Sequence, residues 1–450
     1  MAKTSHEIRD PIHVFVRLDS DDRRVLDSRP FQRLRNINQL ALSHLVYPGA
    51  THKRFEHSLG VMELAGRVYD VLTDRRNLTS HGVTDHFPEL EREDELRYWR
   101  RALRMAALCH DIGHMPFSHT AEQLLPEGWT HERMTAEIID SAEMQQIWSA
   151  MIPPLRSEHI IKLAVGPKDA AELDISEFND WETLLSEIIV GDAFGVDRMD
   201  YLLRDSYHAG VTYGKFDHHR LVDTLRILPA SGTDTEGQGE AEQFELGVEH
   251  GGLHSAEALL LARFFMFMQV YCHPVRRIYD IHLRDFLQEW LQDGTFSTDV
   301  NDHIAMTDVE VMNALRKARS GDIDRGTKHA QRILNRGHFK VLYNRNPDDV
   351  EMNPDAVTCI FEAARDEFGP ENVRADQYVQ SGGAPDFPVL DRDGRIVTAL
   401  SKSQTLETLP VVATGYVFMN RDCIDEAERW LDDTRDQILR ERQEQEEGDT

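Results

Sequence analysis

Cysteine is scarce in this 450-residue chain. The four cysteines lie far apart, and no two of them form a Cys-x-x-Cys pair: Cys109, Cys272, Cys359 and Cys423. This spacing argues against a disulfide framework and against a thiolate zinc site. We expect Cys109 to be a small buried hydrophobic residue, although it directly precedes a His-Asp pair.

Long apolar runs are also absent. No run approaches the roughly 20 residues that a bilayer-spanning helix needs. The first seven residues lack the apolar stretch of a signal peptide. With 40% hydrophobic residues and a mean hydropathy of -0.49, the chain is expected to be a globular, cytoplasmic protein without a membrane partner.

Basic side chains are outnumbered by acidic ones. The chain carries 79 acidic and 50 basic residues, which gives a formal net charge of -29. Such a surface repels nucleic acid on average, so a nucleic-acid partner is not expected. Any polyanion must therefore bind in a local basic pocket.

Helical periodicity dominates what the chain does contain. Apolar residues recur at helical spacing over 54–73, 97–111, 183–208 and 255–292. Pro274 should bend or divide the last of these stretches. A Gly-rich acidic segment over 231–243 predicts a loop.

The pattern changes in the last quarter of the chain. Residues 387–400 show two strand-like runs around Asp393-Gly394, and 411–418 predicts another strand. The expected fold class is therefore mostly α. We expect three parts: a helical core over 1–295, a smaller C-terminal α+β lobe over 296–425, and an acidic helical tail over 426–450.

The densest chemical motif is the run Cys109-His110-Asp111-Ile112-Gly113-His114-Met115-Pro116-Phe117-Ser118-His119. Its His110-Asp111 pair should close the helix over 97–111. Neutral imidazole and carboxylate together suit Zn, Mn, Fe or Ni better than Ca, which prefers oxygen alone. A metal here would support hydrolysis by a metal-activated water.

Two further residues strengthen this interpretation. His57 starts an earlier helix, and Asp197 lies on a third. Taken alone, His57 reads as a capping or core histidine and Asp197 as a surface acid. Together with the His-Asp pair they form a four-ligand set that leaves coordination positions open, as a catalytic site requires.

A longer series of segments carries a family resemblance. In order they are Asp10-Pro11-Ile12-His13, Phe31-Gln32-Arg33-Leu34-Arg35, Tyr47-Pro48-Gly49-Ala50, Arg54-Phe55-Glu56-His57-Ser58-Leu59-Gly60-Val61, the run over 110–119, Trp129-Thr130-His131-Glu132 and the segment over 196–205. This series resembles the deoxynucleoside triphosphate triphosphohydrolases of the sterile-alpha-motif-and-HD-domain type, in their compact prokaryotic form without the appended domain. The resemblance covers roughly residues 8–290 and implies that the helical core is an HD domain.

The resemblance implies an activity and its metals. The family cleaves dNTPs at the α-phosphorus and releases the deoxynucleoside and inorganic triphosphate, an activity that limits dNTP pools. The metal ligands would be His57, His110, Asp111 and Asp197. They would hold a divalent transition metal (Mn, Fe, Zn or Ni), while Mg accompanies the substrate phosphates.

The same resemblance assigns the remaining catalytic residues. His114 and His131 would transfer protons, since imidazole titrates near neutral pH. His119 would contact phosphate, and Glu122 would partner a proton-transfer histidine. His218, His219, His303 and His338 match no motif, and we expect them on the surface.

The implied substrate residues are Gln39, Leu40, Arg54, Arg198, Tyr201, Asp205, Arg263 and Tyr271. Asp197, Tyr201 and Asp205 share one helix face by their i, i+4, i+8 spacing. Asp205 would then accept a hydrogen bond from the 3′-hydroxyl, and Tyr271 would block a 2′-hydroxyl. Phe267 departs from the polar residue that some relatives use near the base edge, which leaves the base preference open.

Three residues near the N-terminus allow two interpretations, an activator site or a subunit interface. Asp27, Gln32 and Arg35 match the guanine-reading triad of the family's activator site, where GTP or a dNTP would bind. Glu7, however, stands where activated relatives carry a lysine, so the triad could serve only a subunit interface. A homotetramer of paired dimers is expected in either case.

Two other functions compete with the triphosphohydrolase. An HD phosphodiesterase or single-strand nuclease would need a local cationic groove. A non-catalytic nucleotide sensor would carry the same fold with a vestigial site, against which the complete ligand set argues.

Overall fold

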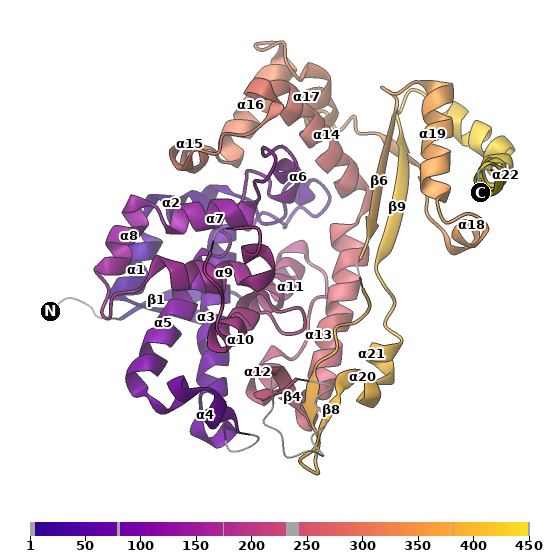
Figure 1. Ribbon diagram of the computed structural model, residues 1–450. Coiled ribbons are helices and arrows are strands. Elements are labelled where there is room, and N and C mark those ends of the chain that lie inside the picture. Colours follow the sequence, from indigo (N-terminus) through magenta and orange to yellow (C-terminus); the bar gives the residue numbers. More distant parts are fainter. Residues whose placement is uncertain (1–4, 79–81, 174, 231–242, 381, 449–450) are drawn as a thin grey trace. The chain divides into compact units, whose positions relative to one another are not determined.

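The computed structural model describes residues 5–78, 82–173, 175–230, 243–380 and 382–448 (Figure 1). The chain divides into two compact units, and each unit is built from three separate stretches of sequence. Unit 1 contains residues 1–263, 297–309 and 384–410, and unit 2 contains 264–296, 310–383 and 411–450. The expected part boundaries at 295 and 425 remain a prediction.

Unit 1 is a helical body. Its helices are α1 Ser20–Leu26, α2 Arg29–Arg33, α3 Arg54–Leu72, α4 Val83–His86, α5 Glu93–Cys109, α6 His119–Glu122, α7 His131–Ile139, α8 Ala142–Ser149, α9 Ser157–Ala170, α10 Asp180–Val190, α11 Val196–Ala209, α12 His218–Thr224, most of α13 Leu253–Met266, α15 Val300–Ala305, α20 Ala399–Lys402 and α21 Gln404–Glu407. Helix α3 lies at its centre: Leu59, Val61 and Leu64 are fully or almost fully buried.

Two small sheets complete unit 1. β1 Ser5–Asp10 and β2 Val14–Asp19 pair antiparallel. The second sheet has the strand order β3-β4-β7-β8, built from β3 Leu225–Pro229, β4 Phe244–Glu249, β7 Pro388–Leu390 and β8 Ile396–Thr398. The predicted hairpin around Asp393-Gly394 is confirmed as β7–β8, and β7 pairs parallel to β4.

Unit 2 is an α+β body. Its elements are a π-helical turn Phe267–Tyr271, α14 Pro274–Trp290, α16 Asp308–Ser320 except its first turn, α17 Thr327–Leu334, β5 Lys340–Asn344, α18 Pro347–Met352, α19 Ala356–Phe368, β6 Val373–Val379, β9 Ala413–Met419 and α22 Ile424–Gly448. The antiparallel sheet has the order β5-β9-β6. Its buried Val373 and Val417 pack with Ile360 of α19 and Leu431 of α22.

The mostly α fold class is confirmed, with two local corrections. The stretch over 183–208 is two helices, α10 and α11, because the chain turns between Gly191 and Gly195 while the apolar pattern continues. His303 and His338 are 2% and 6% exposed, so placing them on the surface was wrong. Residues 231–242 of the predicted acidic loop lie outside the described part of the chain.

A helix must be long and apolar enough to cross a membrane. Among the described residues no single helix meets the requirement, whereas one bent pair, His250–Tyr271 with Pro274–Trp290, meets it jointly.

Close approach of α3 to α11 depends on one glycine. A Cβ at Gly60 would lie 1.9 Å from Oδ1 of Asp200 and 2.4 Å from Nη2 of Arg204. Both of these side chains are fully buried in α11. The missing side chain therefore lets a charged pair of α11 lie directly against the backbone of α3.

We predict that Gly60→Ala lowers the melting temperature, since overpacking a closed interior costs about 1–3 kcal/mol. Gly66→Ala on the same helix is the matched control. Its Cβ would meet no atom closer than Nη1 of Arg104 at 3.0 Å, and the other neighbours, in the Arg104 and Arg100 side chains, lie at 3.5 and 3.6 Å. Differential scanning fluorimetry of both variants checks this, and equal melting temperatures would contradict the close-approach argument.

Candidate metal centre and active site

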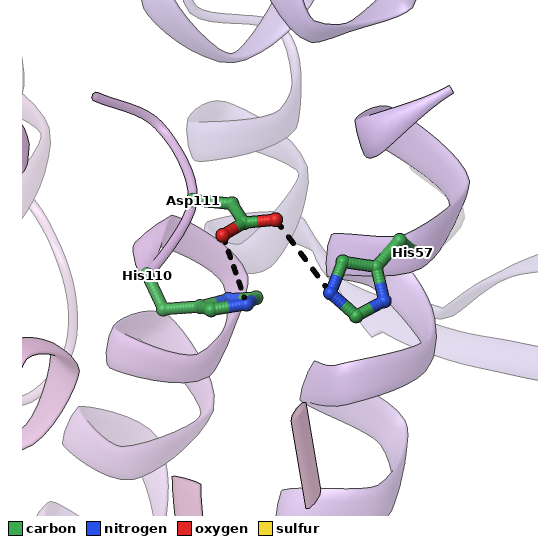
Figure 2. A group of neighbouring side chains, drawn as sticks. All are labelled: His57, His110 and Asp111. Atoms are coloured by element: carbon green, nitrogen blue, oxygen red, sulfur yellow. Dashed lines mark ion pairs between the residues drawn. The ribbon is translucent and has the colours of Figure 1, made fainter. Parts of the chain in front are cut away.

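Three helices of unit 1 bring four polar side chains together. His57 lies in the first turn of α3, His110 caps the C-terminus of α5 with Asp111 directly after it, and Asp197 lies in the first turn of α11. Figure 2 shows His57 and His110 facing Asp111 from either side. We call these four residues the His-Asp cluster.

The distances within the His-Asp cluster are short. Nε2 of His57 lies 3.0 Å from Oδ1 of Asp197 and 3.6 Å from Oδ2 of Asp111. Nε2 of His110 lies 3.4 Å from Oδ1 of Asp111 and 3.3 Å from Oδ1 of Asp197. Ligand atoms of His57, His110 and Asp111 all lie within 4.8 Å of one another, a spacing that one metal ion could occupy.

The tautomer of His110 fits a metal ligand. Its Nδ1–H donates to the carbonyl of Ala107 at 2.8 Å, which leaves a lone pair on Nε2. This buried Nε2 faces Oδ1 of Asp197 at 3.3 Å and Oδ1 of Asp111 at 3.4 Å. A buried nitrogen lone pair facing two carboxylates is the donor set that a divalent transition metal prefers.

His57 is oriented by a carboxylate behind it. Its Nδ1 lies 2.8 Å from Oδ2 of Asp200, so its Nε2 points toward Asp111 and Asp197. Asp200 also bonds Nε2 of His13 at 2.7 Å and Nε of Arg204 at 2.8 Å. The sequence motifs contain His13 and Asp200, yet nothing in their spacing revealed this network.

The network continues one step further. Arg204 donates through Nη1 to Oδ2 of Asp10 at 2.8 Å, and Asp10 in turn accepts the backbone N–H of His13. All of these side chains are buried. The N-terminal motif Asp10-Pro11-Ile12-His13 therefore supports the His-Asp cluster through Asp200 and Arg204.

Charge in the His-Asp cluster favours a bound cation. Burial lowers the pKa of His57, but hydrogen bonds to Asp197 and Asp200 and the charge of Asp111 raise it to about 10. Burial also raises the pKa of Asp111 and Asp197. The positive charges of Arg54 and His110 nevertheless hold the pKa of Asp111 below its ordinary range. Hydrogen bonds from His110 and His57 do the same for the pKa of Asp197. The cluster therefore holds ionised carboxylates, and a dication can replace the proton on His57.

A second histidine pair lies beside the cluster. The rings of His114 and His131 stack with centroids 4.0 Å apart. Nε2 of His114 lies 3.2 Å from Oδ1 of Asp111. Glu122 accepts hydrogen bonds from Nδ1 and from the backbone N–H of His131. His119 begins α6, but its side chain lies outside the described part of the structure.

The two stacked rings have opposite pKa shifts. Burial lowers the pKa of His114 well below its ordinary value, and the charges of Arg54 and His131 lower it further. Burial also lowers the pKa of His131, but the hydrogen bond and charge of Glu122 raise it overall. His131 therefore keeps a proton to higher pH than His114, and pKa values pushed apart in this way suit one acid and one base.

Close approach of α7 again depends on a glycine. A Cβ at Gly113 would lie 2.3 Å from the carbonyl oxygen of His131 and 2.4 Å from the backbone nitrogen of Thr135. The backbone N–H of Gly113 donates to Oγ1 of Thr135 at 3.1 Å. The glycine of the His-Asp run therefore sets the distance between His114 and His131.

Arg54 joins the cluster to the loop after His114. Its Nη1 donates to Asp111, and its Nε and Nη2 donate to the hydroxyl of Ser118 at 3.0 and 2.8 Å. The resemblance placed Arg54 against base and phosphate, and neither is present to show that contact. Ser118 was not singled out from the sequence, because a lone serine in a loop carries no pattern.

Residues expected to read the sugar lie in the same unit. Oδ1 of Asp205 bonds Nε2 of His52 at 2.7 Å, and the backbone N–H of Gln39 donates to the carbonyl of His52 at 3.0 Å. Within the described residues, Oε1 of Gln39 is buried without a hydrogen-bond partner. Leu40 is 6% exposed. His52 joins Asp205 to the Gln39 segment, a contact that no local sequence pattern indicates.

The other expected substrate residues are spread more widely. Arg198 donates to the carbonyls of Gly191 and Asp192. Tyr201 is half-buried on the face of α11 that carries Asp197, and Arg263 is half-buried near the end of α13. Tyr271 ends the π-helical turn of unit 2. Its role at the sugar stays a prediction.

Residues of the expected activator site lie along α1, α2 and the turn that follows. Nε of Arg35 donates to Oε1 of Gln32 at 2.9 Å, and the Arg35 guanidinium lies over the ring of Phe55. Asp27 is exposed and pairs with Arg23 at 3.2 Å. Gln32 and Arg35 are therefore in contact, while Asp27 has a separate partner.

Comparison with known proteins identifies two sequence regions. The HD domain matches residues 54–204, and the HD associated region matches residues 216–367. The first region contains all four residues of the His-Asp cluster.

Similar proteins come from all three domains of life. An uncharacterized protein of Methanocaldococcus jannaschii is 32% identical over 309 residues, which are 69% of this chain and 54% of that protein. The deoxynucleoside triphosphate triphosphohydrolase SAMHD1 of Bos taurus is 29% identical over 370 residues, 77% of this chain and 55% of that protein. The chain thus spans about half the length of these curated relatives.

A solved structure matches more fully. The crystal structure of a hypothetical protein from Aquifex aeolicus has a TM-score of 0.76 and 32% sequence identity. The match covers 95% of this chain and 100% of that chain.

We predict that Asp200→Asn weakens Mn²⁺ binding about 10- to 100-fold, because carboxylates behind histidine ligands fix ring orientation and basicity. Asp85→Asn is the control, since Asp85 is exposed on α4 and lies outside the His-Asp cluster. Equilibrium dialysis against Mn²⁺ gives the affinities, and circular dichroism confirms folding. Equal affinities in two folded variants would disprove the orienting role of Asp200.

Proposed function

Since this chain belongs to the HD-domain family, whose members are metal-dependent hydrolases, we propose that it is a deoxynucleoside triphosphate triphosphohydrolase. It cleaves dNTPs at the α-phosphorus and releases deoxynucleoside and inorganic triphosphate, which controls dNTP pools. The observation that carries this proposal is the His-Asp cluster with the stacked His114 and His131 beside it. Similarity to SAMHD1 of several animals supports the substrate class.

The proposed chemistry is the displacement of the 5′ oxygen by water. A divalent transition metal (Mn, Fe, Zn or Ni) bound by the His-Asp cluster supplies Lewis-acid chemistry to the α-phosphate, and Mg accompanies the substrate phosphates. Water forms the new oxygen–phosphorus bond as the bond from phosphorus to the 5′ oxygen breaks. The Asp197 side chain is 34% exposed, which leaves a side from which substrate and water can approach.

The stacked histidines divide the proton transfers. His131, kept protonated by Glu122, is the group that can donate a proton to the leaving 5′ oxygen. His114 is neutral and can accept a proton from water or bond a phosphate oxygen. His119 contacts phosphate in this proposal, and Arg54, Arg198 and Arg263 neutralise the triphosphate.

Sugar recognition follows from the segment around Gln39. The buried Oε1 of Gln39 and the carboxylate of Asp205 are acceptors for a hydroxyl donor, which suits the 3′-hydroxyl of a deoxyribose. Tyr201 packs on the sugar, Leu40 limits the space beside it, and Tyr271 excludes a 2′-hydroxyl. The base preference stays open at Phe267.

Assembly and activation belong to the same proposal. The protein forms a homotetramer in the cytoplasm, and GTP or a dNTP binds at Asp27, Gln32 and Arg35 as activator. The contact between Gln32 and Arg35 supports a shared role for these two side chains. The alternative is that the three residues only stabilise a subunit interface.

We predict that the purified protein converts each accepted dNTP into deoxynucleoside and triphosphate in Mn²⁺ or Mg²⁺. In H₂¹⁸O the label should enter the triphosphate, because water attacks phosphorus and not carbon. Ion-exchange chromatography with mass spectrometry reads both products. Asp111→Asn should abolish turnover, and Asp85→Asn, at an exposed position of α4, is the matched control.

Other products would identify the competing functions. Orthophosphate or diphosphate as the sole inorganic product would refute the triphosphohydrolase. Cleavage of single-stranded oligonucleotides without dNTP turnover would indicate the nuclease. Nucleotide binding without turnover, even with GTP added, would indicate the sensor.

We predict that Glu122→Gln shifts the alkaline limb of the pH–kcat profile to lower pH. Glu122 raises the pKa of His131, so the proton on His131 persists to higher pH in the wild type. Without that charge the pKa of His131 falls, and the general acid is lost earlier as pH rises. Glu127→Gln, an exposed neighbour, is the control. An unmoved alkaline limb in Glu122→Gln would exclude His131 as the acid.

A further inference from the structure

One buried carboxylate outside the HD domain contacts two segments of the site. Asp308 is 4% exposed and lies in the HD associated region, within the part assigned to unit 1. Its Oδ1 accepts the backbone N–H of Phe117 at 2.8 Å, and its Oδ2 accepts the backbone N–H of Asn38 at 2.8 Å. Each oxygen therefore fixes a different stretch of backbone.

The first stretch is the loop that follows His114. Phe117 and Ser118 both have φ near 58°, a conformation that residues with a side chain seldom adopt. Such backbone persists only where surrounding contacts impose it. The contacts here are Asp308 on the N–H of Phe117 and Arg54 on the hydroxyl of Ser118.

The second stretch leads into Gln39 and Leu40. Asn38 forms a β-bridge with Lys53, and its side-chain oxygen accepts from Nζ of Lys53. Lys53 directly precedes Arg54. Asp308 therefore closes a ring of contacts in which the sugar-reading segment and the phosphate-facing loop share one acceptor group.

Retaining a carboxylate at this position carries a cost. Burial raises the pKa of Asp308 to about 6, although the two backbone N–H bonds and the charges of Lys53 and Arg33 lower it. Because the folded-state pKa lies above the ordinary value, this group's contribution to stability falls as pH rises from about 4 to about 6. At neutral pH, where Asp308 is ionised, maximal folding stability therefore does not explain why a carboxylate is present at this position.

Both N–H groups need an acceptor, and only an ionised carboxylate of this size offers one to each. An asparagine would present an NH₂ group to one of them and leave that donor unsatisfied. We propose that Asp308 is a positioning residue of the active site. It fixes the position of the loop over 112–118 relative to the segment over 38–40. In this way a residue of the HD associated region helps to shape the active site of the HD domain.

The test compares Asp308→Asn with Asp302→Asn in the full-length, metal-loaded protein. Asp302 is an exposed carboxylate on neighbouring α15, bonded to the hydroxyl of Ser297. Hydrogen–deuterium exchange should show the amides of Phe117 or Asn38 exchanging roughly tenfold faster in Asp308→Asn, because a charged acceptor is lost. Exchange in α5 and metal content should stay at wild-type values.

Turnover is the second readout. Of the two measurements, only turnover depends on the proposed function. Asp308→Asn should lower kcat for a dNTP by about 100-fold, since a small misplacement of catalytic groups has that effect. If Asp308→Asn does not fold, Asp308→Glu keeps the charge but shifts both oxygens by one methylene, and the same exchange pattern is expected.

The proposal is overturned if the amides of Phe117 and Asn38 exchange as in the wild type. It is equally overturned if exchange accelerates throughout unit 1 with loss of metal, because Asp308 would then be a general stabilising residue. A wild-type protein without dNTP turnover contradicts the proposed function, whereas the exchange result still decides the role of Asp308.

Discussion

The arrangement of the His-Asp cluster depends on the buried carboxylate of Asp200. It bonds His57, His13 and Arg204 at once, and it has room to do so because α3 carries Gly60 at the point of contact. An unpaired buried carboxylate would be costly, so the opposing guanidinium and the second acid, Asp10, are part of the same requirement. The orientation of His57, and through it the geometry of the cluster, follows from this charge balance.

Sequence reasoning located the cluster because its signal is local. His110 and Asp111 are adjacent, and their helix ends where the apolar pattern stops. Glu122 bonds Nδ1 of His131, and its catalytic partnership with that histidine stays a prediction. Residues that support the cluster from behind were missed, because the roles of Asp200, His52 and Asp308 exist only once distant segments meet. No periodicity connects Asp308 with Phe117 or Asn38.

Errors in the fold prediction have equally physical causes. The helical spacing of apolar residues continues across Gly191–Gly195. A hydrophobic pattern does not reveal a turn when the helices on both sides of it have buried faces. His303 and His338 were expected on the surface because an isolated histidine has no pattern, yet its ring is apolar enough to be buried in neutral form. The hairpin was predicted from Asp393-Gly394, but its partner β4 was not, since parallel pairing with a distant strand leaves no local mark.

That parallel pairing has a consequence for biosynthesis. Unit 1 is assembled from three separate stretches of chain, and β4 receives its neighbour β7 only from residues 388–390. As the polypeptide leaves the ribosome, the earlier helices must wait with the β4 edge unpaired until unit 2 has largely emerged. An open strand edge on a nascent chain invites pairing with other chains. The β4 edge therefore stays open for the time that the ribosome takes to translate the chain from β4 to β7.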